Sequence, residues 1–285
     1  MSNIRDIILN TNNKEIVSKF NRGIYQLHPY HLVEVSPWPI FTAFSLFGLA
    51  FNTVLVMHGY IGVVWIIGLN IICLIYSMSL WVRDVISEGT YLGKHTLAVR
   101  KGLNIGFILF IVSEAMFFVG IFWAYGHSAL APAVELGGIW PPVNIQAIGP
   151  LELPLFNTVV LLASGATITY SHHSLIAGKR NAALYSLFLT ILLAVLFTFC
   201  QYLEYTFATF TFNDGVYGST FYLGTGFHAV HILTGTVFLS VSLWRMYAYH
   251  LTDTHHVGYE TTILMWHFLD IVWLFLFVFF YWWGS

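Results

Sequence analysis

The sequence predicts an all-α polytopic membrane protein with seven transmembrane helices. Hydrophobic residues make up 58% of the 285 residues and charged residues 8%, whereas soluble domains average about 45–50% and about 25%. A soluble enzyme of this length could not bury so many apolar side chains. The apolar runs are continuous, which excludes the alternating strands of a transmembrane barrel. The 11 basic and 13 acidic residues leave a net charge of −2 and no basic stripe for nucleic acid.

Seven apolar runs are long enough to cross a membrane. A helix rises about 1.5 Å per residue, so crossing a hydrocarbon core of about 30 Å takes about 20 residues. Between the third and fourth runs, residues 132–154 contain five prolines and form the longest connection. The predicted helices cover residues 38–57, 63–83, 100–127, 153–176, 182–207, 216–247 and 258–281.

The basic residues predict the orientation. Four precede the first helix, four lie between the second and third, two between the fourth and fifth, and one ends the sixth, so all 11 fall on one side. The positive-inside rule places that side and the N-terminus in the matrix or cytoplasm, and Ser285 outside. These residues are Arg5, Lys14, Lys19, Arg22, Arg83, Lys94, Arg100, Lys101, Lys179, Arg180 and Arg245.

Residues 1–30 form a polar extension on the basic side, and residues 31–285 form a single transmembrane domain. The extension has no apolar core, so it is not a secretory signal, and its acids count against a transit peptide. We expect a short surface helix near Ile4–Ile8. Cys73 and Cys200 each lie inside an apolar run, which excludes a disulfide scaffold and a redox cysteine pair.

Glu114 is an acid in the middle of a predicted helix. It lies on the order of 20 Å from the basic side, where a charge costs about 2.5–3.5 kcal/mol. We expect it to be protonated or hydrogen-bonded, and three interpretations stay open: a proton relay, a lipid-facing sensor, or an acid that ties two helices together. A proton-coupled carrier centred on Glu114 would also need broken helices or inverted repeats, which are not clear here. Glu204, near an outer helix end, is expected to lie close to water.

Histidines form a second polar group within the predicted helices. His228 and His231 share one face of the sixth helix, and His267 and Asp270 have the same spacing on the seventh. Together they could close a zinc or iron site, and a membrane metalloenzyme is therefore the enzyme alternative. Membrane histidines more often form hydrogen bonds to a neighbouring helix, so the residue types permit a metal without requiring one.

Two pairs of neighbouring histidines lie at the basic side of the membrane. His172 and His173 end the fourth helix, and His255 and His256 precede the seventh. Such pairs resemble the histidine boxes of membrane di-iron enzymes, but the repeated i, i+4 spacing of those boxes is missing. Contact with lipid phosphates is an equal alternative.

Motifs from about residue 28 to the end of the chain carry a family resemblance. These motifs, in the order in which they follow one another along the chain, resemble subunit 3 of mitochondrial cytochrome c oxidase, a member of the subunit III family of haem-copper oxidases. The motifs include Ser36-Pro37-Trp38-Pro39, Trp81-Val82-Arg83-Asp84-Val85, Ser113-Glu114, Glu135-Leu136-Gly137-Gly138-Ile139-Trp140-Pro141-Pro142, His172-His173-Ser174-Leu175, Asp214-Gly215-Val216-Tyr217-Gly218-Ser219-Thr220-Phe221 and Tyr281-Trp282-Trp283-Gly284-Ser285.

The resemblance implies a fold and a set of site residues. The first two helices would be separated from the other five by a V-shaped cleft filled with phospholipid. Lipid contacts and support of proton uptake would fall on Glu88, His95, Glu114 and Trp123. Ser87 stands where some relatives have a basic residue, which departs from the family pattern of headgroup contacts.

The resemblance also implies a function and partners. The complex would transfer electrons from cytochrome c to oxygen and pump protons in the mitochondrial inner membrane, with this N-terminus in the matrix and the C-terminus in the intermembrane space. This chain would carry no catalytic residue, haem or copper, since haem a, haem a3 and copper belong to partner subunits. Its partners would be subunit 1, subunit 2, small accessory subunits and phospholipids, with cardiolipin and a respiratory supercomplex as further candidates.

Overall fold

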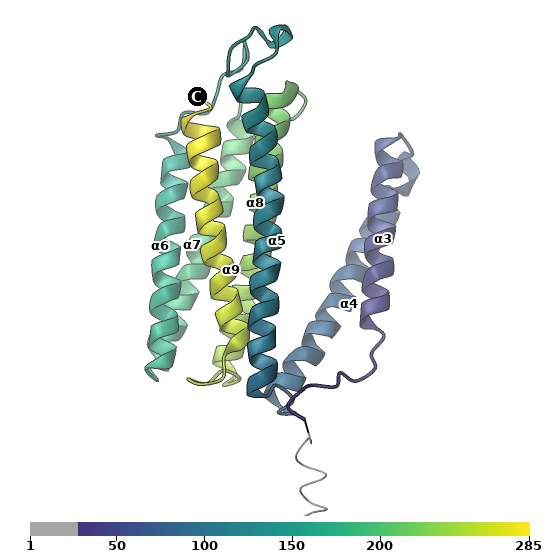
Figure 1. The fold of residues 1–285 in the computed structure, drawn as a ribbon, viewed down its shortest axis with the longest axis vertical. Helices are drawn as coiled ribbons and strands as arrows, with labels where there is room; N and C mark the ends of the chain where they lie inside the picture. Colours follow the sequence, from purple (N-terminus) through teal and green to yellow (C-terminus); the bar gives the residue numbers. More distant parts are fainter. Residues whose placement is uncertain (1–27) are drawn as a thin grey trace, which may run out of the picture. The chain divides into compact units, whose positions relative to one another are not determined.

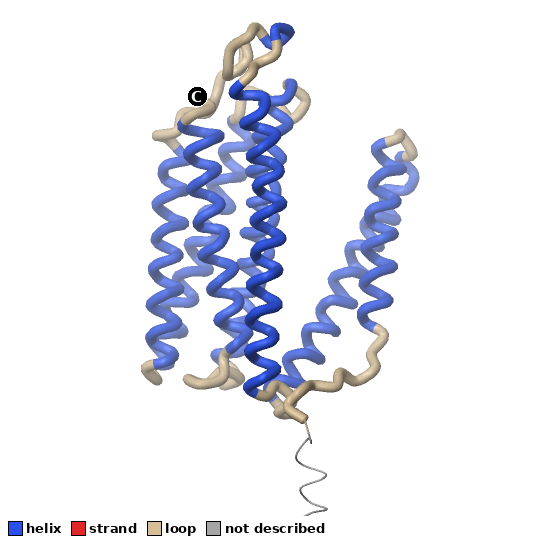
Figure 2. Tube along the Cα trace, in the orientation of Figure 1, coloured by secondary structure: helices blue, strands red, loops and turns tan. Residues whose placement is uncertain are grey.

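The computed structural model describes residues 28–285, and every long element in that range is a helix (Figures 1 and 2). Seven helices in this range are long and apolar enough to cross a membrane, which confirms the predicted fold class. The helix expected near Ile4–Ile8 lies outside the described residues. The long helices are α3 (Trp38–Met57), α4 (Val64–Thr90), α5 (Leu97–Leu130), α6 (Leu153–Ile176), α7 (Arg180–Phe207), α8 (Gly215–Tyr247) and α9 (Val257–Leu276).

Three single-turn elements complete the described fold. The 3₁₀ turns η1 (Ile61–Val63) and η2 (Val134–Leu136) lie before α4 and in the connection from α5 to α6. The π turn η3 (Phe277–Trp282) continues α9 almost to the end of the chain. The connection between α5 and α6 is the longest one in the described range, as its prolines predicted.

Observed helix ends differ from the predicted ones, most of all where polar residues continue α4 beyond its apolar run. α4 extends to Thr90, past the predicted end at residue 83, and α5 runs from Leu97 to Leu130 instead of from 100 to 127. Backbone hydrogen bonds hold a helix together whether or not its side chains are apolar. Hydropathy therefore predicts the apolar part of each helix but not the full length of the helix.

The described residues divide into two compact units, one that ends at Leu103 and one that covers Asn104–Ser285. In the first unit, α3 and α4 pack together, and the side chains buried between them are small or polar. Thr42 Oγ1 donates a hydrogen bond to Ser77 Oγ at 3.1 Å, while large apolar side chains such as Phe44 are exposed. In lipid, small and polar side chains let helices approach closely and bond to each other, so this arrangement is the one expected of a membrane helix pair.

The Asn70 side chain of α4 lies directly against Gly48 of α3. A Cβ added to Gly48 would lie 2.6 Å from Asn70 Oδ1, whereas a Cβ on Gly68 would meet nothing within 4 Å. We expect Gly48→Leu to separate the two helices and to cost about 1–3 kcal/mol through overpacking, and Gly68→Leu to be neutral. The yield of a disulfide between cysteines placed at Thr42 and Ser77 measures the separation. Equal yields in both variants would contradict this prediction.

In the second unit, α6, α7, α8 and α9 form a bundle, because α6 packs on α7, α7 on α8, α8 on α9 and α9 on α6. α5 joins this bundle through aromatic contacts. The ring centroids of Tyr125 and Phe280 are 4.2 Å apart, and those of Phe118 and His231 are 5.5 Å apart.

Glu204 is only 3% exposed and accepts a hydrogen bond from Gln201 Nε2 at 3.1 Å. The expectation that Glu204 lies close to water was wrong.

A ladder of buried hydrogen bonds joins α9 to α6. Tyr259, Trp266 and Trp273 of α9 recur every seven residues and are 0–1% exposed. They donate hydrogen bonds of 2.7–2.9 Å to the hydroxyl oxygens of Ser171, Ser164 and Thr158. Each ring therefore fills the space between the helices and satisfies its own polar atom, as large buried aromatic side chains require.

Candidate functional site

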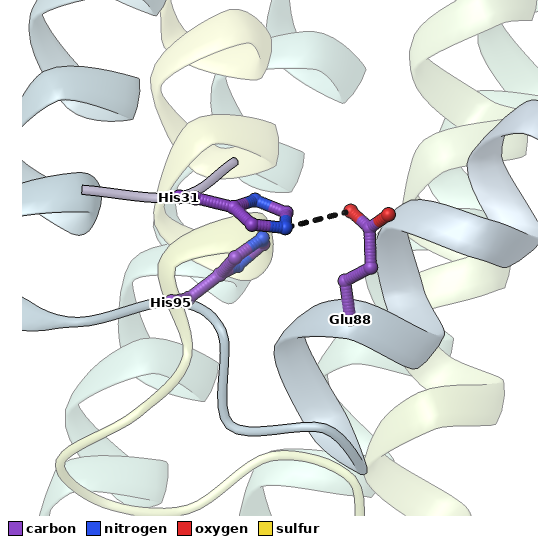
Figure 3. A group of neighbouring side chains, drawn as sticks. All are labelled: His31, Glu88 and His95. Atoms are coloured by element: carbon purple, nitrogen blue, oxygen red, sulfur yellow. Dashed lines mark ion pairs between the residues drawn. The ribbon is translucent and has the colours of Figure 1, made fainter. Parts of the chain in front are cut away.

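Three side chains in the first unit gather near the end of α4: His31, Glu88 and His95 (Figure 3). His31 Nε2 lies 3.9 Å from Glu88 Oε2, and the two side chains are 9% and 16% exposed. The His31 and His95 rings meet edge-on with centroids 5.8 Å apart. The structure thus places two of the four predicted site residues, Glu88 and His95, in one cluster and adds His31 to them.

The backbone around this cluster explains why its three members meet. α4 ends in a tight turn in which Lys94 N donates to Glu88 O at 3.1 Å and Gly93 adopts a φ of +61°. The turn folds His95 back over Gly89, where an added Cβ would lie 2.8 Å from His95 Nδ1. A side chain at position 89 would therefore push the imidazole away from Glu88.

The segment before α3 is fastened to the same turn by two contacts. Thr96 Oγ1 donates a hydrogen bond to Pro29 O, and Lys94 Nζ lies 3.8 Å from Glu34 Oε1. These contacts bring His31 against Glu88 although the two are far apart in the sequence. We call residues 28–36 the N-terminal strap.

His31 Nε2 is a buried nitrogen without a hydrogen-bond partner within the described chain. A buried polar atom without a partner costs about 1–3 kcal/mol, which favours a ligand at this position. Two imidazoles and a carboxylate, with ligand atoms within 4.8 Å of one another, suit a small cation or a polar group that carries hydrogen-bond donors and acceptors. A phospholipid headgroup is one such group.

Glu114 forms its contact in the second unit, with His231. Glu114 Oε2 of α5 lies 2.8 Å from His231 Nε2 of α8, and the two side chains are 23% and 17% exposed. Each residue lies near the middle of its helix. Of the three interpretations of Glu114, the structure shows the tie between two helices directly.

The hydrogen bonds of His231 fix how many protons the pair holds. His231 Nδ1 lies 2.7 Å from Phe227 O, and a carbonyl oxygen only accepts, so Nδ1 carries a proton. The bond between His231 Nε2 and Glu114 then needs one further proton, which sits either on the carboxyl or on the imidazole. The tie is therefore also a pair that can move a proton between its members.

Trp123, the fourth predicted site residue, is 75% exposed on α5. No ring contact of Trp123 is found among residues 28–285. An exposed indole on an apolar helix is able to contact lipid or another protein chain, and the structure does not bring it into the Glu114–His231 pair.

The metal site considered for α8 and α9 is not assembled. His228 Nε2 lies 3.2 Å from Leu269 O, and His231 is bound to Glu114. His267 Nε2 lies 3.2 Å from Thr169 Oγ1, and its Nδ1 lies 3.4 Å from Asp270 Oδ2. Only His267 and Asp270 contact each other, and the four residues do not converge on one point among the described residues.

Two contacts of the predicted site residues were not foreseen from the sequence, those of His31 with Glu88 and of His231 with Glu114. His31 lies five residues before the Ser36-Pro37-Trp38-Pro39 motif, and the strap brings it to Glu88. For His231 a signal exists: it lies at the centre of its helix, as Glu114 does, so the two share a membrane depth. A search for polar residues that lie at the same distance from the ends of different predicted helices would have suggested the pair.

Comparison with known protein families gives a match over most of the chain. A family model described as cytochrome c oxidase subunit III matches residues 28–285, which is 258 of the 285 residues. The chain belongs to this family. The subunit III match begins at the N-terminal strap and includes all seven long helices, so the strap, the cluster around Glu88 and the Glu114–His231 pair all lie inside the family region.

Named relatives share more than half of their residues with this chain. Cytochrome c oxidase subunit 3 of Yarrowia lipolytica is 60% identical over 261 residues, covering 92% of this chain and 97% of the relative. That of Emericella nidulans is 61% identical over 260 residues, covering 91% and 97%. That of Saccharomyces cerevisiae is 56% identical over 268 residues, covering 94% and 100%. A subunit III is one part of cytochrome c oxidase, respiratory complex IV, and so forms an assembly with other subunits.

Proposed function

We propose that this subunit III supports the oxidase without a redox centre of its own. It packs on subunit 1 in the mitochondrial inner membrane, with its N-terminus in the matrix and its C-terminus in the intermembrane space. It holds phospholipid at His31, Glu88 and His95, and it supports proton uptake through Glu114 and His231. Haem a, haem a3 and copper, together with the contact to cytochrome c, belong to partner subunits of the complex.

The observation that carries this proposal is the anchored cluster at the end of α4. It combines a buried unpartnered nitrogen with a carboxylate, on a helix whose apolar side chains, such as Ile72, are exposed. Acyl chains would cover the apolar faces of α3 and α4, and the headgroup would meet the polar cluster at the interface. The V-shaped lipid cleft implied by the family resemblance is part of this proposal.

Exposed apolar faces also support contact with other chains. In the most apolar stretches of the first three spans, only 6–17% of residues are buried, against 28–50% in the other four. Such faces require lipid or protein partners. Subunit 1 is the main partner that we propose, with subunit 2, small accessory subunits, cardiolipin and a respiratory supercomplex as further candidates.

The first test is a reduced-minus-oxidised absorption spectrum of the complex purified in mild detergent through a tag on this chain. We expect haem a bands in about equimolar proportion to the chain, as for one subunit of a stable assembly. A spectrum without haem a, from a preparation shown to retain its other subunits, would refute the proposed placement in the oxidase.

Glu88→Gln tests the lipid site. The substitution keeps the size of the side chain but removes the charge that would pair with a headgroup amine, and a hydrogen bond to a charged group contributes about 1.5–3 kcal/mol. We expect bound phospholipid to exchange about 10–100-fold faster, measured by mass spectrometry of lipids retained per haem a after detergent washing. Glu135→Gln, at an exposed carboxylate of η2 that is not part of this cluster, is the matched control. Equal retention in both variants would argue against a headgroup at Glu88.

A further inference from the structure

A second cluster of ligand-type side chains lies in the second unit, away from the residues discussed above. His172 lies near the end of α6, His256 immediately precedes α9, and Glu260 is in the first turn of α9. His172 Nε2 lies 3.3 Å from His256 Nε2, and His256 Nε2 lies 3.3 Å from Glu260 Oε1. The two pairs of neighbouring histidines in the sequence thus each contribute one residue to this cluster.

The hydrogen bond on the other side of the His256 ring prepares Nε2 to act as a ligand. His256 Nδ1 lies 2.8 Å from Thr252 O, and a carbonyl oxygen only accepts, so Nδ1 carries the proton. Metal-binding histidines commonly donate their second nitrogen to a carbonyl in this way, which fixes both tautomer and ring orientation. The His256 side chain is 5% exposed, so its position is fixed by packing as well.

Two further ligand-type atoms face the lone pair of His256 Nε2. An imidazole nitrogen of His172 and a carboxylate oxygen of Glu260 both lie 3.3 Å from it. A cation at the centre of the three atoms would be bound by all of them at once.

The distances fit one class of cation. Zinc binds imidazole nitrogen at about 2.0–2.1 Å in tetrahedral geometry, which places two ligand atoms about 3.3–3.4 Å apart. The two separations from His256 Nε2 are 3.3 Å, and all three ligand atoms lie within 4.8 Å of one another. Two imidazoles and one carboxylate favour zinc over magnesium or calcium, which prefer oxygen ligands.

We propose that His172 Nε2, His256 Nε2 and Glu260 Oε1 form a zinc site that links the end of α6 to the start of α9. The fourth position is open to water. Zinc has no redox chemistry in proteins, so the site is structural and fastens the two helices that the buried aromatic ladder also joins. This proposal departs from the expectation, implied by the family resemblance, that the chain holds no metal, and it does not depend on the proposed lipid site.

The test is a zinc titration of the purified, chelator-treated oxidase complex, with bound metal measured by mass spectrometry after equilibrium dialysis. We expect His172→Gln and Glu260→Gln to bind one zinc equivalent fewer than the wild type at zinc concentrations that saturate the site. His173→Gln is the matched control, since this neighbouring histidine is exposed and outside the cluster. Haem a content confirms that each variant is assembled. Wild-type stoichiometry and affinity in all three variants would overturn the proposal.

A second measurement needs no variant and so is independent of assembly. Diethyl pyrocarbonate modifies imidazole nitrogens that are free, and peptide mass spectrometry reads the extent at each histidine. In the wild-type complex we expect zinc to slow the modification of His172 at least about 10-fold, in line with the loss of a metal-bound nitrogen's lone pair, and to leave His173 unchanged. An equal rate at His172 with and without zinc would overturn the site.

Discussion

Trp266→Ala is expected to destabilise the second unit by about 3–5 kcal/mol, the usual cost of removing a large buried aromatic side chain. Trp266 is fully buried, donates to Ser164 Oγ at 2.9 Å, and packs where an added Cβ on Gly235 would lie 3.1 Å from its ring. Packing contacts hold membrane helices together in lipid, so the cavity would loosen α9 from both α6 and α8. The measurement is the temperature at which this subunit leaves the detergent-solubilised complex, read by native electrophoresis.

Two further substitutions sharpen this prediction. Trp266→Phe keeps most of the packing and removes only the hydrogen bond, so we expect a loss of about 1 kcal/mol. Trp65→Ala removes a side chain that is 87% exposed and should leave the release temperature unchanged. If the subunit with Trp266→Ala left the complex at the same temperature as the subunit with Trp65→Ala, the buried aromatic ladder would not be what holds α9 in place.

Glu114→Leu is expected to lower the stability of the second unit by about 1–3 kcal/mol, because it leaves His231 Nε2 without a partner inside the membrane. Glu114→Gln should stay within about 0.5 kcal/mol of the wild type, since the amide group is able to donate to His231 Nε2 while Nδ1 remains bonded to Phe227 O. Replacing both partners, in Glu114→Leu with His231→Leu, should recover most of the lost stability. The release temperature of the subunit measures all three.

The Gln variant also separates the structural role of Glu114 from a role in proton transfer. An amide holds the helices together but does not exchange a proton at this position. We expect full haem a content in Glu114→Gln together with earlier loss of activity during sustained turnover, measured as oxygen consumption over time. Activity that lasts as long as in the wild type would assign Glu114 to the helix tie alone, and a loss of haem a would contradict the supporting role proposed for this subunit.

The sequence alone determined the class of fold and the positions of the membrane spans. Long apolar runs have few alternatives in a bilayer, because each backbone polar group must find its partner within the same helix. For the same reason the predicted spans agree with the observed helices except near their polar ends, as at Thr90 of α4. The motifs also identified the family, since the order of short motifs is a property of the chain and not of its folding.

Only the tertiary structure decided which polar side chains meet. Glu114 and His231 are 117 residues apart, and His172 and His256 are 84 apart. Local patterns say which face of a helix a residue occupies, but not which helix lies against that face. That choice depends on close packing, such as Trp266 over Gly235, and on loop contacts such as the bond from Thr96 to Pro29. The sites of this protein are therefore products of helix pairing, whereas its spans are products of hydropathy.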